Sequence, residues 1–206
     1  SLIAASNELP AKGEGLEALY DRFLIRQFVG CIEQEYAFDQ MISSTREVEP
    51  EIPAKLQVDD ELYNQIQAES EKVGIHYTIF ELIHNIKREI EQYNTGRDEN
   101  TPPIYISDRR WKKIVGLLRT SAYLNESPGI HFSDCLLMSA CLWDEVSQLP
   151  IIENIVEQSI ARGINTYLLG EKRLEQKLDT LKESMRAGRG VRGLRGGGVR
   201  GGGGGG

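Results

Sequence analysis

Apolar residues in the middle of the chain recur with the period of an α-helix. Between residues 79 and 93 they form one stripe at spacings of three and four, which predicts an amphipathic helix ended by Asn94-Thr95-Gly96. This stripe consists of Ile79, Leu82, Ile83, Ile86, Ile90 and Tyr93. A second stripe predicts a helix capped by Ser107, because serine is a favoured N-cap residue. Its apolar members are Trp111, Ile114, Val115, Leu118 and Ala122.

Five further stretches also favour helix. Residues 31–44 and 60–73 carry weaker apolar stripes, and Gly74 should end the second of them. A very apolar helix is expected from Asp134 to about Trp143, at the centre of a helical bundle. Another begins near Pro150, and the charged stretch around residues 174–185 forms a last, solvent-exposed or coiled-coil-like helix.

The first thirty residues have a different pattern. Two short apolar runs, at residues 2–5 and 23–25, predict β-strands separated by a glycine-marked loop and a short acidic helix. Asn7 and Arg22 stand beside these runs. Because open α/β sheets keep their chemistry at the ends of strands, both side chains are expected at a sheet rim.

The predicted fold is mainly α, with five parts along the chain. Residues 1–46 finish an α/β core, and the proline-marked residues 47–54 form a linker. Residues 55–147 form an all-α bundle, and residues 150–187 form a helical extension. Residues 188–206 are expected to be a disordered Gly/Arg tail, since they contain almost nothing to bury.

Composition limits the possible functions. The net charge is −7, and the tail carries four arginines without an acid, which leaves −11 on the rest and argues against a nucleic-acid-binding body. No apolar run approaches the roughly 20 residues that span a bilayer. The three cysteines and three histidines have no metal-ligand spacing, so we expect reduced thiols in a cytoplasmic protein. The chain begins inside a predicted strand without Met, and we expect it to be part of a longer protein.

Arg109 is the most informative charged residue. It falls in the first turn of the helix capped by Ser107, where a cation opposes the positive end of the helix dipole, and Asp108 offsets only part of that cost. This conflict favours an anion-binding role, with Arg110 as the neighbouring alternative. A solvated basic patch that includes Lys112 is the other interpretation. Similarly, Asn7 alone could be a strand-end residue and Arg22 a surface ion-pair residue.

Three motifs carry a resemblance to a known family. They are A-S-N-E-L-P at residues 5–10, E-G-L-E-A-L-Y-D-R-F at residues 14–23, and S-D-R-R-W-K-K at residues 107–113. With C-L-W-D at residues 141–144, they resemble the MoxR family of AAA+ ATPases, in particular its RavA-type branch. The resemblance covers about residues 1–147 and includes the sensor 1 strand, the arginine finger and the helical lid.

The resemblance implies a role for each candidate residue. Asn7 would be sensor 1 and align the attacking water. Arg22 would be an arginine finger, acting in trans on ATP bound by the neighbouring subunit. Arg109 would be sensor 2 and contact the γ-phosphate in its own subunit, with Arg110 as the second choice for binding the nucleotide.

The resemblance also implies cofactors and partners. The cofactors would be ATP and Mg²⁺, but the chain contains neither a phosphate loop nor an Asp-Glu strand, so those ligands are expected outside it and the chain alone should hydrolyse no ATP. By this resemblance, the whole protein would assemble with copies of itself into a ring of six subunits. It would remodel client proteins together with a protein that carries a von Willebrand factor A domain.

Two alternatives remain open. A non-enzymatic helical interaction module would not need Asn7, Arg22 or Arg109. An RNA-binding protein would use the Arg-Gly tail, and its binding would weaken steeply with salt and disappear without residues 188–206.

Overall fold

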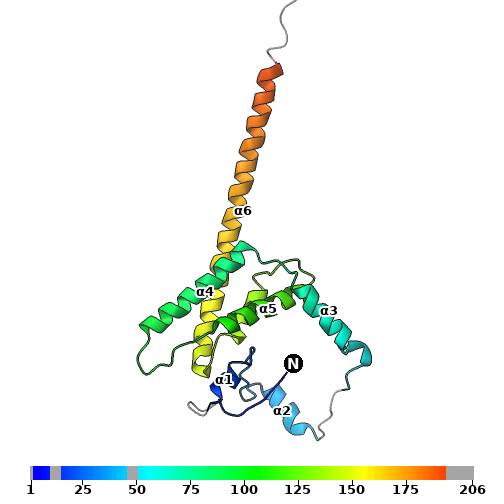
Figure 1. The fold of residues 1–206 in the computed structure, drawn as a ribbon, viewed down its shortest axis with the longest axis vertical. Coiled ribbons are helices and arrows are strands. Elements are labelled where there is room, and N and C mark those ends of the chain that lie inside the picture. The colour runs from blue at the N-terminus through cyan, green and yellow to red at the C-terminus, as the bar shows by residue number, and fades with distance from the viewer. Residues whose placement is uncertain (1, 10–14, 46–50, 194–206) are drawn as a thin grey trace, which may run out of the picture. The chain divides into compact units, whose positions relative to one another are not determined.

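The computed structural model describes residues 2–9, 15–45 and 51–193, and these residues are mainly helical (Figure 1). They divide into two compact units, one ending at Gly163 and the other beginning at Ile164. The elements are α1 (Glu17–Tyr20), α2 (Glu35–Ser43), η1 (Ala54–Leu56), α3 (Asp60–Ser70), α4 (Tyr77–Gly96), α5 (Asp108–Leu124), η2 (Asp134–Ala140), η3 (Val146–Gln148) and α6 (Leu149–Gly193).

The predicted helices that correspond to α3, α4 and α5 are confirmed, and the starts of α3 and α5 have local causes. The Asp59 side chain accepts a hydrogen bond from the Leu62 amide at the start of α3. At the start of α5, the Ser107 hydroxyl accepts one from the Arg110 amide. These bonds satisfy amides that have no partner within the helix, so each polar residue fixes where its helix begins.

The apolar stripes of α4 and α5 form one core with η2 and the first turns of α6. Ile86 of α4 and Ile114 and Leu118 of α5 are fully buried, as the periodicity predicts. Both α3 and η2 pack against α5. The predicted central stretch is also buried, and its buried members are Cys135, Met138, Cys141, Leu142 and Trp143. The core therefore holds α5 and the loop after η2 in fixed relation.

Two helix predictions need correction. The apolar stretch from Asp134 is a short 3₁₀ helix, η2, that ends at Ala140. Residues 141–145 after it are not helical, because the Trp143 carbonyl and Asp144 amide bond to side chains instead of to the next turn. The helix from Pro150 and the charged helix around residues 174–185 are not separate. Instead, α6 is one element from Leu149 to Gly193, since a single glycine such as Gly163 costs only about 1 kcal/mol in a helix.

The two predicted strands are not formed. Residues 2–5 and 23–25 have no regular structure, and in the described part of the chain the one β-type pairing is an isolated bridge between Gly74 and Gly129. A strand needs a neighbour to pair its backbone groups, and the described residues offer none. The described part of residues 1–46 contains α1 and α2 and no strand, so it forms no sheet rim beside Asn7 and Arg22.

The boundaries of the other predicted parts are only partly described. α6 extends to Gly193, past the predicted start of the tail, and residues 194–206 lie outside the described residues. The predicted linker lies outside them up to residue 50, and η1 begins at its end. None of the described helices is both long and apolar enough to cross a membrane.

Candidate functional site

Arg110, in the first turn of α5, is a buried cation. Arg110 is only 1% exposed to solvent, and its side chain is one of the largest that are fully buried. One guanidinium nitrogen donates to Oδ1 of Asp144 at 2.9 Å, and another donates to the Trp143 carbonyl at 3.2 Å. The same guanidinium lies 3.9 Å from Oδ1 of Asp21. Arg110 is therefore committed to protein partners.

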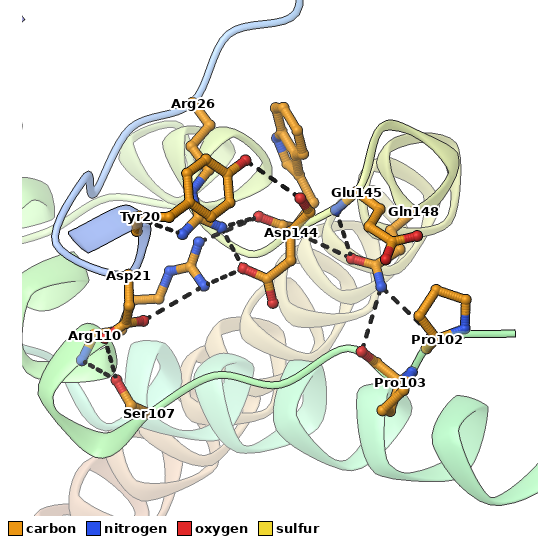
Figure 2. Close-up of polar contacts among 11 residues, drawn as sticks. Tyr20, Asp21, Arg26, Pro102, Pro103, Ser107, Arg110, Asp144, Glu145 and Gln148 are labelled. Carbon is orange, nitrogen blue, oxygen red and sulfur yellow. Dashed lines mark hydrogen bonds and ion pairs between the residues drawn. The ribbon is translucent and has the colours of Figure 1, made fainter. Parts of the chain in front are cut away.

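Arg26 is a second buried arginine, and it shares two of those partners, Asp144 and the Trp143 carbonyl (Figure 2). Its guanidinium donates to the Trp143 carbonyl and to Oδ1 of Asp144, and it donates to the Tyr20 carbonyl at 3.0 Å. It also stacks on the Tyr20 ring, with Cζ 3.9 Å from the ring centroid. Two buried guanidinium groups thus meet at one carboxylate oxygen.

Asp144 is held in place by its own backbone. Oε1 of Gln148 accepts hydrogen bonds from the Asp144 amide at 2.9 Å and from the Glu145 amide at 3.2 Å. Nε2 of the buried Gln148 points toward the carbonyls of Pro102 and Pro103, at 3.5 and 3.4 Å. Figure 2 shows this chain of contacts from the residues before α5 to Asp144. The buried Gln148 therefore holds the backbone that carries the Asp144 carboxylate.

A third contact joins the N-terminal segment to α5. Ser107 donates a hydrogen bond from its hydroxyl to Oδ2 of Asp21 at 3.4 Å. Tyr20, beside Asp21, donates from its phenol to the Asp144 carbonyl at 3.2 Å. Burial raises the pKa of Tyr20, and the negative charge of Asp144 raises it further, while Arg110 opposes both effects. Tyr20 is therefore a neutral donor near pH 7.

We call the set Tyr20, Asp21, Arg26, Arg110 and Asp144 the arginine cluster. Its two cations are balanced by two acids whose side chains are about one third exposed, 35% for Asp21 and 32% for Asp144. Nε of both arginines is buried without a hydrogen-bond partner among the described residues. The cluster is thus neutral overall and closely packed, which suits a structural junction.

The three residues predicted to act on the nucleotide have a different environment. Asn7, Arg22 and Arg109 are all exposed, and their side chains make no hydrogen bond or ion pair with another described residue. Arg22 follows Asp21 directly, and Arg109 lies two residues after Ser107, so both flank the Asp21–Ser107 contact. The structure therefore brings the segment that carries Arg22 close to the start of α5, which carries Arg109. Asn7 makes no side-chain hydrogen bond with either of these segments.

The role of Asp144 and Arg26 was missed by reasoning from the sequence. Asp144 belongs to the C-L-W-D motif, which was a visible signal without an assigned role. Arg26 directly follows the apolar run at residues 23–25, which the sequence pattern predicts as a strand. Its partners Trp143 and Asp144 lie more than a hundred residues away in the chain, and no local pattern reports such a pairing.

The described residues offer no cluster of three or more His, Cys, Asp or Glu side chains that could hold a metal ion. A shallow hollow lies over one face of α4, lined by His84, Lys87, Arg88 and Glu91. It is separate from the arginine cluster, and all four residues come from one helix.

Comparison with known proteins defines the class of this helical bundle. Residues 78–156 match the family described as AAA lid domain. The matched stretch contains most of α4, all of α5, the arginine-cluster residue Asp144 and the first turns of α6. The chain therefore contains an AAA lid domain, which supports its interpretation as a C-terminal region of an AAA+ ATPase.

Two curated relatives come from Methanocaldococcus jannaschii. The chain is 31% identical to uncharacterized protein MJ0079 over 156 residues, which is 76% of this chain and 37% of the relative. It is 35% identical to uncharacterized protein MJ0812 over 145 residues, which is 70% of this chain and 35% of the relative. The chain thus spans little more than a third of the length of these relatives.

Proposed function

We propose that the chain is the C-terminal portion of a MoxR/RavA-like AAA+ ATPase, which couples ATP hydrolysis to the remodelling of partner proteins in a ring. The observation that carries the proposal is the AAA lid domain at residues 78–156, with an exposed Arg109 in the first turn of its helix α5 whose side chain pairs with no other described residue. The shorter length of the chain relative to its relatives is consistent with nucleotide-binding motifs elsewhere in the protein.

The proposed mechanism divides the arginines by their surroundings. Arg110 is engaged by Asp144, whereas Arg109 is exposed and in this proposal contacts the γ-phosphate bound in its own subunit. Arg22 is exposed on the neighbouring segment and acts on the ATP of the adjacent subunit as an arginine finger. Arginines of this kind neutralise the charge that spreads over the γ-phosphoryl oxygens in the transition state. Asn7 aligns the attacking water.

The first test is to read the gene upstream of Ser1. A phosphate loop and an apolar strand ending in Asp-Glu would supply the ligands for ATP and Mg²⁺ that the proposal requires. The complete protein, purified as a ring, should then hydrolyse ATP. An upstream sequence without these motifs, or a complete protein without turnover, would contradict the proposal and leave a helical interaction module.

A mixing experiment tests the roles of Arg22 and Arg109 in the complete protein. Arg22→Ala and Arg109→Ala should each lower kcat by about a hundredfold or more, because each removes charge stabilisation in the transition state. Mixing the two inactive variants should restore turnover at about a quarter of the interfaces, where an intact sensor 2 meets an intact finger. Lys55→Ala and Lys112→Ala, which remove exposed lysines, are matched controls and should have little effect.

No restoration on mixing would mean that the two arginines serve the same subunit, which would contradict the assignment of Arg22 in trans. Full activity of either single variant would remove that arginine from the mechanism.

A further inference from the structure

The segment that carries Arg22 is fixed to the lid on both sides of that residue. Before Arg22, Asp21 contacts Ser107 and Tyr20 bonds to the Asp144 carbonyl. After it, the Arg26 amide donates to the Ala140 carbonyl at 2.8 Å. Arg22 itself remains exposed between these anchors. A short segment anchored at both ends can move little relative to its support, so this one should follow the lid.

The Asp144 carboxylate adds a further link between this segment and the lid. Its Oδ1 accepts from Arg26 of the segment and from Arg110 of α5, so one oxygen joins the two elements. Among the described residues, Asp21 is the other carboxylate near these arginines, and it lies farther from Arg110, at 3.9 Å. If Asp144 lost its charge, two buried cations would share one distant, partly exposed acid. Their burial would then be unfavourable, and the segment would loosen.

We propose that Asp144 is a positioning residue. It fastens the segment of residues 20–26 to the start of α5, so that Arg22 and Arg109 are carried on one rigid body. This inference rests on the proposed function and adds to it that the segment of residues 20–26 moves together with the lid. A lid that moves when its own nucleotide changes state moves the finger offered to the neighbouring subunit by the same rotation. Arg109, which acts in its own subunit, and Arg22, which acts on the neighbouring subunit, are then coupled directly, and no other moving element is needed between them.

The first experiment measures Asp144→Asn in the complete protein. Asparagine keeps the size and one carbonyl oxygen but removes the charge. We expect kcat to fall by about ten- to a hundredfold with KM little changed, because a misplaced finger weakens the transition state and not substrate binding. Asp98→Asn, at an exposed aspartate outside the cluster, is the matched control and should leave kcat unchanged.

A double variant shows whether Asp144 acts through Arg22. In an Arg22→Ala background the finger is already absent, so adding Asp144→Asn should lower kcat by less than about twofold. Multiplied effects would show that Asp144 acts independently of the finger and would overturn the inference. The variants are compared only at temperatures at which tryptophan fluorescence shows that each of them is folded. A fall in kcat then cannot result from unfolding.

A second experiment does not depend on the folding of Asp144→Asn. Asp21→Cys and Ser107→Cys, in a Cys31→Ser background, place two thiols where side-chain oxygens lie 3.4 Å apart. A short bifunctional thiol reagent then locks the finger segment to α5. If the two move as one body, the locked protein should retain turnover within about twofold of the same variant treated with a monofunctional reagent. Loss of turnover on locking would mean that the segment must leave the lid, which would overturn the inference.

These experiments separate the inference from the proposed function. Turnover by the unmodified protein, combined with multiplied effects or inactivation on locking, overturns the inference alone. Absence of turnover in the unmodified complete protein overturns the proposed function, and the inference falls with it.

Discussion

Arg109 and Arg110 are neighbours in the sequence, and the structure predicts opposite results when each is replaced by alanine. Arg110 is 1% exposed and bonds to Asp144 and to the Trp143 carbonyl. Arg109 is exposed and makes no such contact with the described residues. Arg110→Ala should therefore destabilise the chain strongly, and Arg109→Ala should hardly affect it.

The magnitude follows from what each change leaves behind. Arg110→Ala removes one partner of a buried ion pair, removes one of the two arginine donors to the Trp143 carbonyl and opens a cavity, and changes of this kind cost about 3–5 kcal/mol. Because Asp144 is 32% exposed and keeps Arg26, water and that second arginine should hold the cost near the lower end. Arg110→Met refills most of the cavity and should cost less than Arg110→Ala. Arg109→Ala should lie within about 0.5 kcal/mol of the original chain.

Urea unfolding followed by tryptophan fluorescence measures these differences. The chain has two tryptophans, Trp111 and Trp143, and both lie in the unit that ends at Gly163. The signal therefore reports on the arginine cluster and not on the rest of α6. Equal midpoints for the Arg109 and Arg110 variants, or a neutral Arg110→Ala, would refute the assignment of Arg110 as structural and reopen it as the nucleotide-sensing residue.

Three other predictions concern the core. The hydroxyl of Ser159 is fully buried without a hydrogen-bond partner among the described residues, so Ser159→Ala should raise the free energy of unfolding by about 1 kcal/mol and shift the urea midpoint upward. A lower midpoint for this variant would show that the hydroxyl has a partner. A Cβ at Gly163 would lie 2.7 Å from Cε1 of Phe132, so Gly163→Ala should forgo the usual gain of about 1 kcal/mol for alanine in a helix, and a full gain would contradict that contact. Burial raises the pKa of Cys135 from 9.0 to about 12, so a thiol reagent at pH 8 should label exposed Cys31 first; labelling of both at one rate would contradict it.

The raised thiol pKa also sets a direction for stability at alkaline pH. The folded state keeps the Cys135 proton up to about pH 12, whereas the unfolded chain loses it near pH 9.0. The unfolded state binds fewer protons between these values, so the contribution of this thiol to stability should fall as the pH rises above 9. Cys135→Ala should flatten the dependence of the urea midpoint on pH over this interval.

The sequence by itself determined the helices of the bundle and much of its core. The stripe from Ile79 to Ile90 and the cap at Ser107 are local features, and period and capping report them directly. The same reasoning placed strands at residues 2–5 and 23–25, where apolar runs occur but no pairing partner exists among the described residues. A strand is not a local structure, because its hydrogen bonds belong to its neighbours, so its prediction failed where that of the helices succeeded.

Only the tertiary structure decided which arginine is buried. Successive helix residues lie about 100° apart around the axis, so Arg109 and Arg110 face different surroundings although their sequence contexts are nearly identical. Their surroundings depend on Asp144 and Arg26, which reach Arg110 from distant parts of the chain. Buried charge is stable only where an opposite charge meets it in space, and that meeting is a property of the packed fold and not of any local pattern.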